Sequence, residues 1–266
     1  MELHLKDKVV CIAGGTSGIG EAVALAFARE GCKVAACGRS EAKINALKET
    51  FAKEGYNIFT MSVDVGVNDQ LKSFIHGTAE HYGRLDVMIN NAGISIRQPF
   101  DTLPEEDWYK VINTNQKSVF YGCAFAAEEM RKCGGGVIIN TSSFTSIVPT
   151  CGSAVYSSTK AAVDQMTKVF AAELAADNIR VVGVQPGMTV SPLTEEECRK
   201  NFDRFVSLIA MKKLAYPEDM VGAYLFLASD NASYISGMSI PVTGAKLTAQ
   251  NPHYSWQLKE AEKMQK

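Results

Sequence analysis

The stretch VVCIAGGTSGIG occupies residues 9–20 and places a short apolar run directly before a cluster of glycines. The residues that follow, 21–30, are rich in Ala, Leu and Glu and predict a helix. A strand, a tight turn and a helix N-terminus in this order suit a pyrophosphate, because glycines let the backbone approach it and the helix dipole favours its negative charge. A flexible turn without a ligand is the alternative. The residues expected to contact a nucleotide here are Gly14, Thr16, Ser17, Gly18, Ile19 and Gly20.

Beyond this junction, short β-branched runs alternate with longer helical stretches along the chain. Strands are expected at 9–13, 33–37, 57–63, 85–90, 136–140, 180–185 and 239–242. Helices are expected at 21–30, 41–54, 68–82, 105–132, 154–176 and 218–228. Strands that are apolar along their whole length and separated by helices indicate a parallel sheet buried on both faces. We therefore expect an α/β fold, namely a single Rossmann-type doubly wound domain with a seven-stranded parallel sheet and helices on both faces.

The composition of the 266 residues excludes several classes of protein. With 46% hydrophobic and 21% charged residues, the chain has the proportions of a globular protein and not those of a disordered, collagen-like or disulfide-scaffold protein. A net charge of −2 gives no electrostatic footprint for nucleic acid or an anionic membrane. The longest apolar runs fall short of the roughly 18–20 residues that a membrane span needs. The N-terminus lacks the basic and then apolar form of a signal peptide.

The seven cysteines and four histidines suggest neither a disulfide framework nor a metal-ligand set. The cysteine count is odd and no C-x-x-C pair occurs, which predicts reduced thiols. His76 and His81 would lie on different faces of one helix, and His4 and His253 stand at opposite ends of the chain. We therefore expect a cytoplasmic protein with no metal site and with no nucleic-acid or membrane partner.

The end of the second predicted strand carries the signal for the choice of nucleotide. Residues 37–40 read Cys-Gly-Arg-Ser, where a protein that binds NAD usually has a carboxylate for the ribose hydroxyl. Arg39 can pair with a 2′-phosphate in bidentate fashion, aided by Ser40. A solvated cation at the start of a helix is the alternative for Arg39. The residues favour NADP(H) over NAD(H) as the cofactor.

Tyr156 and Lys160 are four residues apart in a predicted helix, which places both side chains on one face. Ser143 precedes Tyr156 by thirteen residues and lies at the end of a predicted strand. A nearby ammonium and a positive nicotinamide would both favour the tyrosine phenolate. We expect Tyr156 to transfer a proton to a substrate oxygen to which Ser143 donates a hydrogen bond. Ser142 is the competing donor, but strand alternation puts it on the opposite face.

These motifs and several others in the same order give the chain a resemblance to the short-chain dehydrogenase/reductase family, from about residue 5 to about residue 247. The stretches that carry the resemblance are AGGTSGIG at 13–20, Asp64-Val65, NNAG at 90–93, NTSS at 140–143, YSSTK at 156–160 and PGMTVS at 186–191. The resemblance implies a nicotinamide-dependent enzyme that transfers hydride between a secondary alcohol and a ketone. Its expected partners are a small carbonyl or alcohol substrate and further copies of the chain.

The resemblance also implies roles for single residues. The pattern from Trp108 to Phe120 places the family's catalytic asparagine at Asn115, where it would hold a water that links the active-site lysine to a proton relay. An asparagine on a helix surface, or a shift to Asn113, is the alternative. The implied catalytic residues are Asn115, Ser143, Tyr156 and Lys160. The implied cofactor contacts beyond the glycine turn are Asp64, Val65, Asn91, Ala92, Gly93, Tyr156, Lys160, Pro186, Gly187, Thr189 and Ser191. Asp64 could instead be a helix N-cap.

Some positions depart from the family's pattern. Ser17 stands where members that prefer NADP often carry a basic residue, which leaves a 2′-phosphate to Arg39 and nearby hydroxyls. Val182 replaces an asparagine of the sixth strand, a change expected to affect packing alone. The family's C-terminal Val-Asp-Gly-Gly is here Val-Thr-Gly-Ala at 242–245, in a region that lies near a subunit contact in the family.

One domain is expected over residues 1–247, followed at 248–266 by a tail or by an arm that packs on a neighbouring subunit. Within the domain, a lid at about 192–214 would cover the substrate pocket. The apolar residues of this lid are Leu193, Phe202, Phe205, Leu208, Ile209 and Met211. Such a surface suits a sizeable apolar substrate, and ordinary core packing is the alternative.

Two stretches, RLDVMIN at 84–90 and NIRVVGV at 178–184, are similar to bacterial bile-acid hydroxysteroid dehydrogenases. We therefore expect a hydroxysteroid or bile acid as substrate, with a 3-oxoacyl thioester on a carrier protein, or a small ketone or sugar, as the alternative. A protein that binds NADP(H) without turnover is a second alternative. The helical regions at 105–132 and 154–176 resemble those that pair between subunits in the family, which implies a homotetramer or a dimer.

Overall fold

The computed structural model describes residues 2–246 and 248–264. Its strands are β1 (Val9–Ala13), β2 (Lys33–Gly38), β3 (Ile58–Ser62), β4 (Val87–Asn90), β5 (Gly136–Thr141), β6 (Ile179–Pro186) and β7 (Ser239–Val242). Within the described residues they form one seven-stranded sheet in the order β3-β2-β1-β4-β5-β6-β7. All pairs of neighbouring strands are parallel. The expected α/β sheet is confirmed.

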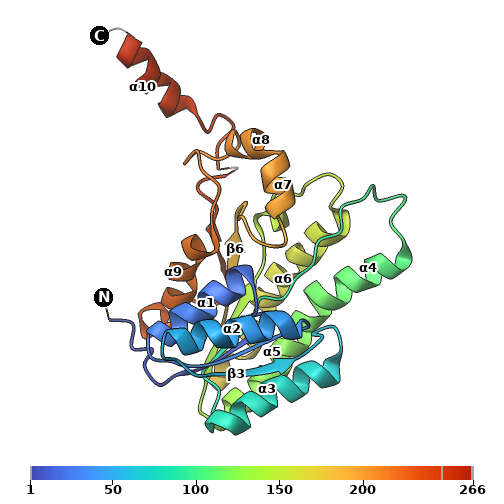
Figure 1. Cartoon of the computed structure of the whole chain (residues 1–266), viewed down its shortest axis with the longest axis vertical. Coiled ribbons are helices and arrows are strands. Elements are labelled where there is room, and N and C mark those ends of the chain that lie inside the picture. Colours follow the sequence, from blue (N-terminus) through green and yellow to red (C-terminus); the bar gives the residue numbers. More distant parts are fainter. Residues whose placement is uncertain (1, 247, 265–266) are drawn as a thin grey trace.

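Helices cover both faces of this sheet (Figure 1). The long helices are α1 (Gly18–Arg29), α2 (Glu41–Lys53), α3 (Asn68–Tyr82), α4 (Glu105–Ile112), α5 (Ser118–Lys132), α6 (Ala154–Glu173), α9 (Pro217–Ala228) and α10 (Tyr254–Met264), and two short ones are α7 (Glu195–Lys200) and α8 (Phe202–Val206). Along β1, Val9 and Cys11 pack toward α3, α5 and α6, whereas Val10 and Ile12 pack toward α1, α2 and α9. Successive side chains of a strand point to opposite faces, so a strand covered on both faces must be apolar throughout.

The order of the strands reverses between β1 and β4, which leaves a crevice beyond their carboxyl ends. The last residues of the two strands, Ala13 and Asn90, are register partners. The carbonyl of Ala13 accepts hydrogen bonds from the N–H groups of Asn91 and Ala92, at 3.0 and 2.8 Å. The glycine turn and the NNAG segment therefore meet at one point of the sheet edge.

The single helix expected at 105–132 is interrupted. A turn of π-helix, Asn113–Lys117, separates α4 from α5, although the flanking backbone keeps helical dihedral angles. A π-turn inserts one residue into a helix, and such insertions are frequent at functional sites. The first helix also begins at Gly18 and not at residue 21, because the end of the glycine turn is itself its first turn.

The lid contains α7 and α8, and the segment after the sheet ends in α10, which the sequence pattern did not predict. Figure 1 shows α10 extending away from the body beside α8. His253 Nε2 and Trp256 Nε1 contact the carbonyl oxygens of Ile209 and Ala210 at 3.0 and 2.9 Å, which connects this segment to the lid. The expected domain boundary at Leu247 lies outside the described residues.

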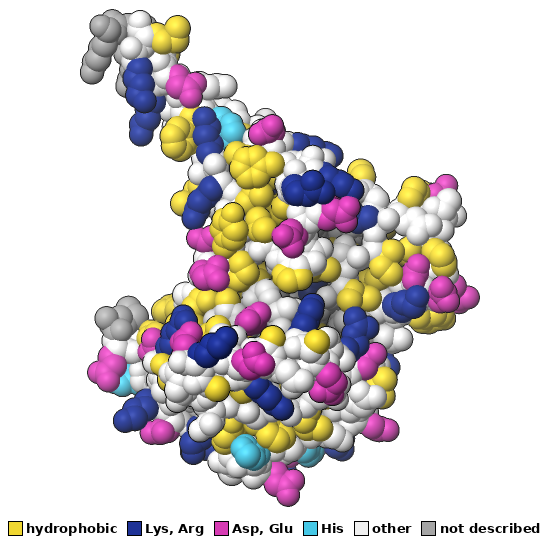
Figure 2. Space-filling view, viewed as in Figure 1, with side chains coloured by type: hydrophobic (Ala, Val, Ile, Leu, Met, Phe, Trp, Pro, Cys, Tyr) yellow, Lys and Arg dark blue, Asp and Glu magenta, His cyan; other side chains and the backbone are white. Residues whose placement is uncertain are grey.

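Charged side chains of both signs are interspersed over the sheet and its helices on the face shown in Figure 2. All seven cysteines are free thiols, among which Cys11, Cys37 and Cys123 are buried and Cys32 is partly exposed. None of the helices in the described part of the chain combines the length and apolar character that crossing a bilayer requires.

Candidate active site

The turn after β1 forms a cradle whose shape depends on the absence of side chains. Gly14 has φ +81°, and a Cβ there would lie 2.6 Å from the backbone of Ala92. A Cβ on Gly20 would lie 2.1 Å from the carbonyl oxygen of Gly14. None of the described side chains caps the start of α1 at Ser17, so the first N–H groups of this helix remain available to a ligand. These features fit a pyrophosphate group.

Asn91 closes the cradle from the β4 side. Its Nδ2 donates to the carbonyl oxygen of Gly14 at 2.8 Å, and its Oδ1 accepts from Thr141 Oγ1 at 3.3 Å. The Thr141 hydroxyl lies 2.7 Å from that of the buried Tyr224. Sequence reasoning missed Thr141, although it stands beside the predicted serine pair in the NTSS stretch.

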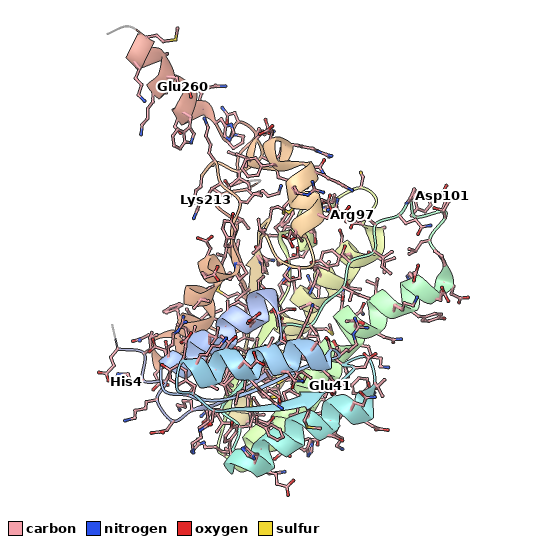
Figure 3. All side chains as sticks on the ribbon, in the orientation of Figure 1. His4, Glu41, Arg97, Asp101, Lys213 and Glu260 are labelled. Atoms are coloured by element: carbon pink, nitrogen blue, oxygen red, sulfur yellow. The ribbon has the colours of Figure 1, made fainter. Side chains whose placement is uncertain are left out.

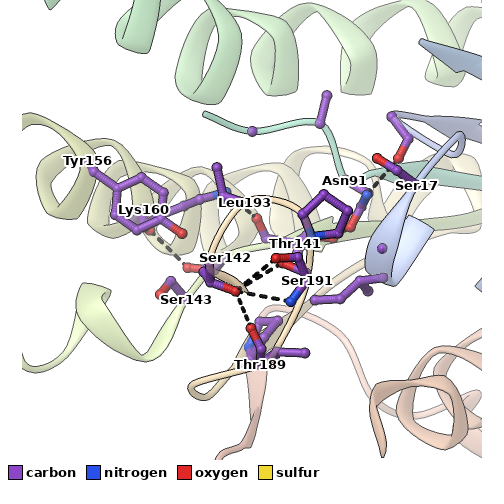
Figure 4. A pocket seen from close by; sticks show the side chains of 18 of the residues that line it. Ser17, Asn91, Thr141, Ser142, Ser143, Tyr156, Lys160, Thr189, Ser191 and Leu193 are labelled. Atoms are coloured by element: carbon purple, nitrogen blue, oxygen red, sulfur yellow. Dashed lines mark hydrogen bonds between the residues drawn. The ribbon is translucent and has the colours of Figure 1, made fainter. Parts of the chain in front are cut away.

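A single pocket runs from this cradle to the predicted catalytic side chains (Figure 4). It is lined by the predicted residues Gly14, Ser17, Gly18, Ile19, Asn91, Ala92, Gly93, Ser143, Tyr156, Lys160, Pro186, Gly187, Thr189 and Ser191. The other residues that line it are Thr141, Ser142, Pro192, Leu193 and Thr194. The predicted residues that do not line it are Thr16, Gly20, Arg39, Ser40, Asp64, Val65 and Asn115.

The predicted cofactor contacts Arg39, Ser40 and Asp64 lie beyond the cradle, after the ends of β2 and β3. Arg39 and Ser40 are exposed, and Ser40 Oγ caps α2 by accepting from the N–H of Lys43. The Asp64 carboxylate accepts from the N–H of Gly66 at 2.9 Å, while Val67 is the N-cap of α3. The alternative that Asp64 caps the helix is therefore wrong.

Asn115 lies in the π-turn and is completely buried, which excludes the alternative of a surface asparagine. Its Oδ1 accepts from the N–H of Ile94 and its Nδ2 donates to the carbonyl of the same residue, both at 2.8 Å. A Cβ on Gly93 would lie 3.6 Å from both Asn115 Oδ1 and Lys160 Nζ. The asparagine and the lysine therefore both lie close to this glycine.

On α6, Lys160 is almost completely buried, and its Nζ donates to the carbonyl oxygen of Thr141 at 2.8 Å. The ammonium lies 5.8 Å from the ring centroid of Tyr156. Burial lowers the pKa of Lys160 to about 8, although the negative charge of Asp164 acts in the opposite direction. Burial raises the pKa of Tyr156, although the Ser143 hydroxyl and the positive charge of Arg97 both act to lower it. Without a ligand, burial thus favours the neutral form of both groups.

The hydroxyl groups of the two candidate serines, Ser142 and Ser143, make different hydrogen bonds. Ser142 Oγ donates to the carbonyl of Lys160 at 3.0 Å, so its proton is engaged in the protein. Ser143 Oγ accepts from the N–H and the hydroxyl of Thr145, at 3.2 and 3.0 Å. In the hydrogen bonds of the described residues its own proton goes to no other acceptor, so it is available to a substrate oxygen beside Tyr156. This geometry favours Ser143 over Ser142 as the donor.

The loop that follows β6 is held by Thr194, a residue that sequence reasoning missed. Its hydroxyl accepts from the N–H of Ser191 at 3.1 Å, lies 3.1 Å from the Ser191 hydroxyl, and donates to the carbonyl of Thr189. A hydroxyl three residues after Ser191 is the local signal that could have indicated this turn.

The apolar residues predicted for the lid divide into two groups. Phe205 and Ile209 are buried with Cys198 in a small cluster of their own, which is the core-packing alternative. The exposed members are Leu193, Phe202, Leu208 and Met211. Arg97, which no motif indicated, pairs with Glu197 of α7, and Figure 3 shows it beside that helix.

Comparisons with known proteins agree on one family. A model described as short chain dehydrogenase matches residues 8–201. The chain is 38% identical over 243 residues to a 3-oxoacyl-[acyl-carrier-protein] reductase of Thermotoga maritima, a match that covers 91% of this chain and 98% of that protein. It is 36% identical over 248 residues to a 3alpha-hydroxysteroid dehydrogenase of Mediterraneibacter gnavus, covering 92% and 99% of the two chains.

A solved structure also matches along nearly the whole of both chains. It comes from Beutenbergia cavernae, is described as an NAD(P) dependent gluconate 5-dehydrogenase, and contains NADP at low occupancy. It superposes with a TM-score of 0.89 and 29% sequence identity, covering 94% of this chain and 100% of that one.

Proposed function

The chain belongs to the short-chain dehydrogenase/reductase family, and on that premise we propose that it interconverts a secondary alcohol and a ketone with NADP(H) as its cofactor. The observation that carries the proposal is one pocket with Ser143, Tyr156 and Lys160 at one end and a glycine cradle for a nucleotide at the other. An oxidoreductase of this family needs both ends at once, because the hydride donor and the proton donor act on the same carbonyl group.

The nicotinamide, when bound, supplies the hydride for reduction or accepts it for oxidation. In the direction of reduction, the Tyr156 hydroxyl donates its proton to the substrate oxygen, and in oxidation it takes that proton back. Ser143 donates a hydrogen bond to the same oxygen with its free hydroxyl proton. The buried Lys160 ammonium favours the phenolate form of Tyr156. Asn115 holds the backbone of Ile94 in place through its hydrogen bonds.

The preference for NADP(H) rests on Arg39. It stands exposed at the end of β2, next to Gly38, where a Cβ would lie 2.2 Å from Thr16 Oγ1 of the cradle turn. A guanidinium at this place can bind a 2′-phosphate through two parallel hydrogen bonds, aided by the Ser40 hydroxyl. The related structure from Beutenbergia cavernae with NADP bound supports the same preference.

A hydroxysteroid or bile acid is the substrate that we propose first. Its support is the 36% identity to a 3alpha-hydroxysteroid dehydrogenase and the exposed apolar side chains of the lid, among them Leu193 and Phe202. The alternative is 3-oxoacyl-[acyl-carrier-protein] reduction, favoured by the 38% identity to such a reductase, or reduction of a small ketone or sugar derivative, favoured by the gluconate 5-dehydrogenase structure. Binding of NADP(H) without turnover is a second alternative.

A homotetramer, or a dimer, is proposed from the outer surfaces of α5 and α6. A groove between them is lined by apolar residues such as Phe120, Ala127 and Phe170, and Val169 is exposed nearby. Burial of such a surface in a partner copy stabilises an oligomer. Sedimentation of a monomer at micromolar concentration would contradict this proposal.

The seven free thiols are the support for a reducing, cytoplasmic location.

The experiment that tests the proposed function is the oxidation of NADPH and of NADH, followed by absorbance, with oxo bile acids, other ketosteroids, 3-oxoacyl thioesters and small oxo acids. Oxidation of NADPH that depends on one ketosteroid would establish substrate class, cofactor and position of attack together. If every carbonyl fails while NADPH still binds, the non-catalytic alternative gains support.

A further inference from the structure

Lys246 is a buried cation without a buried anion. It lies four residues after β7, its residue is only 6% exposed, and its ammonium lies 4.9 Å from the ring centroid of Phe144 and 5.9 Å from that of Phe205. Among the residues that the structure describes, no carboxylate pairs with this ammonium and no acceptor takes a hydrogen bond from it. The two aromatic rings attract the ammonium but supply no hydrogen-bond acceptor for its N–H groups.

A further cation stands close to Lys246. Arg204 on α8 lies near enough for its charge to lower the pKa of both Lys246 and Arg97, in each case after the effect of burial. Arg97 pairs with Glu197. Asp203 directly precedes Arg204 in α8, and the side chains of adjacent helix residues do not face each other. Figure 2 shows Lys and Arg side chains, with Asp and Glu side chains among them, on the part of the surface formed by α7 and α8. Arg204 thus lies near two other cations, of which Lys246 pairs with no carboxylate among the described residues.

Lys246 and Arg97 lie beside residues of the catalytic end, although neither lines the pocket itself. Phe144 directly follows Ser143 along the chain, and Phe205 belongs to the lid. Arg97 is close enough to Tyr156 that each charge affects the pKa of the other group. An anion held by Lys246 and Arg204 would therefore lie near the groups that act on the carbonyl.

The position of Lys246 follows from a segment in which this chain differs from the family's pattern. Where the family ends in Val-Asp-Gly-Gly, this sequence has Val-Thr-Gly-Ala at 242–245 and then Lys246. Gly244 and Ala245 have φ of +61° and +60°, so the backbone turns sharply just before the lysine. A left-handed alanine is uncommon and persists where the surroundings determine the conformation. The turn brings Lys246 back against Phe144.

We propose that the substrate carries a carboxylate, which Lys246 and Arg204 bind while Ser143 and Tyr156 act on its carbonyl or hydroxyl group. The planar guanidinium and the three ammonium donors match the two oxygens of a carboxylate. The inference rests on the proposed function and narrows its substrate class to oxo or hydroxy acids. Both the side chain of a bile acid and a short oxo acid offer this group.

The test compares each acid with its primary amide, a neutral group of the same shape. One arm uses an oxo bile acid and its amide, and the other uses a short-chain oxo acid and its amide. For the wild type we expect kcat/KM for the acid to exceed that for the amide at least tenfold in one arm, which also identifies the source of the carboxylate. Lys246→Met should lower this acid-to-amide ratio at least tenfold, and Arg204→Gln should lower it less.

Methionine fills the slot between Phe144 and Phe205 with similar length and favourable sulfur–aromatic contacts, so Lys246→Met is expected to fold. The matched control is Lys200→Met, which removes a cation of the lid that already pairs with Glu196. It should leave the acid-to-amide ratio unchanged. If wild type shows equal kcat/KM for acid and amide, or if Lys246→Met lowers both equally, the ammonium serves the fold and the proposal is overturned.

Calorimetric titration separates this inference from the proposed function. If no carbonyl is reduced at all, the proposed function fails, and the same acids and amides are then titrated into the wild type and into Lys246→Met. Binding of an acid in preference to its amide, lost in Lys246→Met, would still support the carboxylate site. Equal binding of acid and amide, or binding of neither, would overturn it.

Discussion

The nucleotide cradle and the lid both contribute to one pocket, but the cradle is shaped by backbone atoms and the lid by side chains. In the cradle, backbone atoms approach each other so closely that Gly14 and Gly20 leave no room for a Cβ. In the lid, side chains such as Phe205 and Ile209 pack into a small cluster of their own. A backbone contact has no substitute, whereas a side-chain contact can be exchanged for another of similar shape. The cradle should therefore tolerate no added atom, and the substrate end should respond to single functional groups.

The largest effect is expected from removing one oxygen at the substrate end. Tyr156→Phe should lower ketone reduction by a factor of about 10²–10⁴, because proton transfer to the substrate is lost. The affinity for NADPH, measured by fluorescence titration, should change little, since the cradle is untouched. Tyr234→Phe, at an exposed tyrosine, is the matched control and should keep full activity. Full activity in Tyr156→Phe would contradict the proposed proton transfer.

One added carbon in the cradle should have the next largest effect. In Gly20→Ala the new Cβ would meet the Gly14 carbonyl oxygen at 2.1 Å and Asn91 Nδ2 at 2.6 Å. We expect a loss of about 3 kcal/mol in unfolding free energy or in the affinity for both nucleotides, because backbone cannot yield as a side chain can. Gly222→Ala is the control, since its Cβ would meet nothing within 4 Å. That helical glycine should gain about 0.5–1 kcal/mol on replacement. Equal changes in unfolding free energy and nucleotide affinity for Gly20→Ala and Gly222→Ala would mean that the cradle tolerates a Cβ as well as an ordinary helix does.

The same contrast explains how far the sequence could predict the structure. Strands buried on both faces leave uninterrupted apolar runs, as Val9–Ala13 does, and glycines forced by close backbone approach leave a local motif. Both signals are local in the sequence. The π-turn at Asn113–Lys117 adds one residue without changing the composition of the helix, so periodicity could not show it. α10 was missed because polar residues dominate it and its contacts are to the distant lid.

The substrate end was predicted only where family motifs reached it. Ser143, Tyr156 and Lys160 follow from spacing and resemblance, and the structure brings them to one pocket. Arg97 and Lys246 are different, because each depends on contacts with residues far away in the chain. No local pattern reveals that a lysine after the last strand will lie against an aromatic ring beside the catalytic serine.

The pH dependence of stability tests the burial of Lys160. Since burial lowers its pKa from 10.5 to about 8, the folded protein binds fewer protons than the unfolded chain between these values. Stability from this group therefore rises with pH through that window, by up to about 3 kcal/mol. Lys160→Met removes this dependence but also the hydrogen bond to Thr141, worth about 1 kcal/mol. The variant should be the more stable one near neutral pH and should lose that advantage toward pH 10.

Urea unfolding of both proteins across this pH range measures the effect. Other groups that titrate at high pH are common to both proteins and cancel in the difference. A difference between the two unfolding free energies that stays constant with pH would mean that Lys160 is not desolvated in the fold.

Arg39 lies outside the rigid part of the cradle, so its replacement should affect one nucleotide and not the other. Arg39→Leu should weaken NADPH binding by about 1.5–3 kcal/mol, roughly tenfold to a hundredfold, through loss of a charge-assisted pair. NADH binding should remain, because its ribose lacks the phosphate. Arg29→Leu is the control, since this arginine already pairs with Glu54. Equal weakening of both nucleotides by Arg39→Leu would mean that the guanidinium does not contact the 2′-phosphate.

The smallest effect is expected where the lid meets the C-terminal helix. Trp256→Phe removes the indole N–H that donates to the Ala210 carbonyl at 2.9 Å, while a ring remains for Lys212, whose ammonium lies 4.8 Å from the Trp256 ring centroid. A net hydrogen bond is worth about 0.5–1.5 kcal/mol, so lid amides should exchange with solvent about twofold to tenfold faster. Amides of α1, beside the cradle, should exchange as before. We expect the lid to open by itself and the cradle to open only with the sheet. Trp108→Phe, without such a bond among the described residues, should change neither rate, and acceleration of both regions in Trp256→Phe would show that they open as one unit.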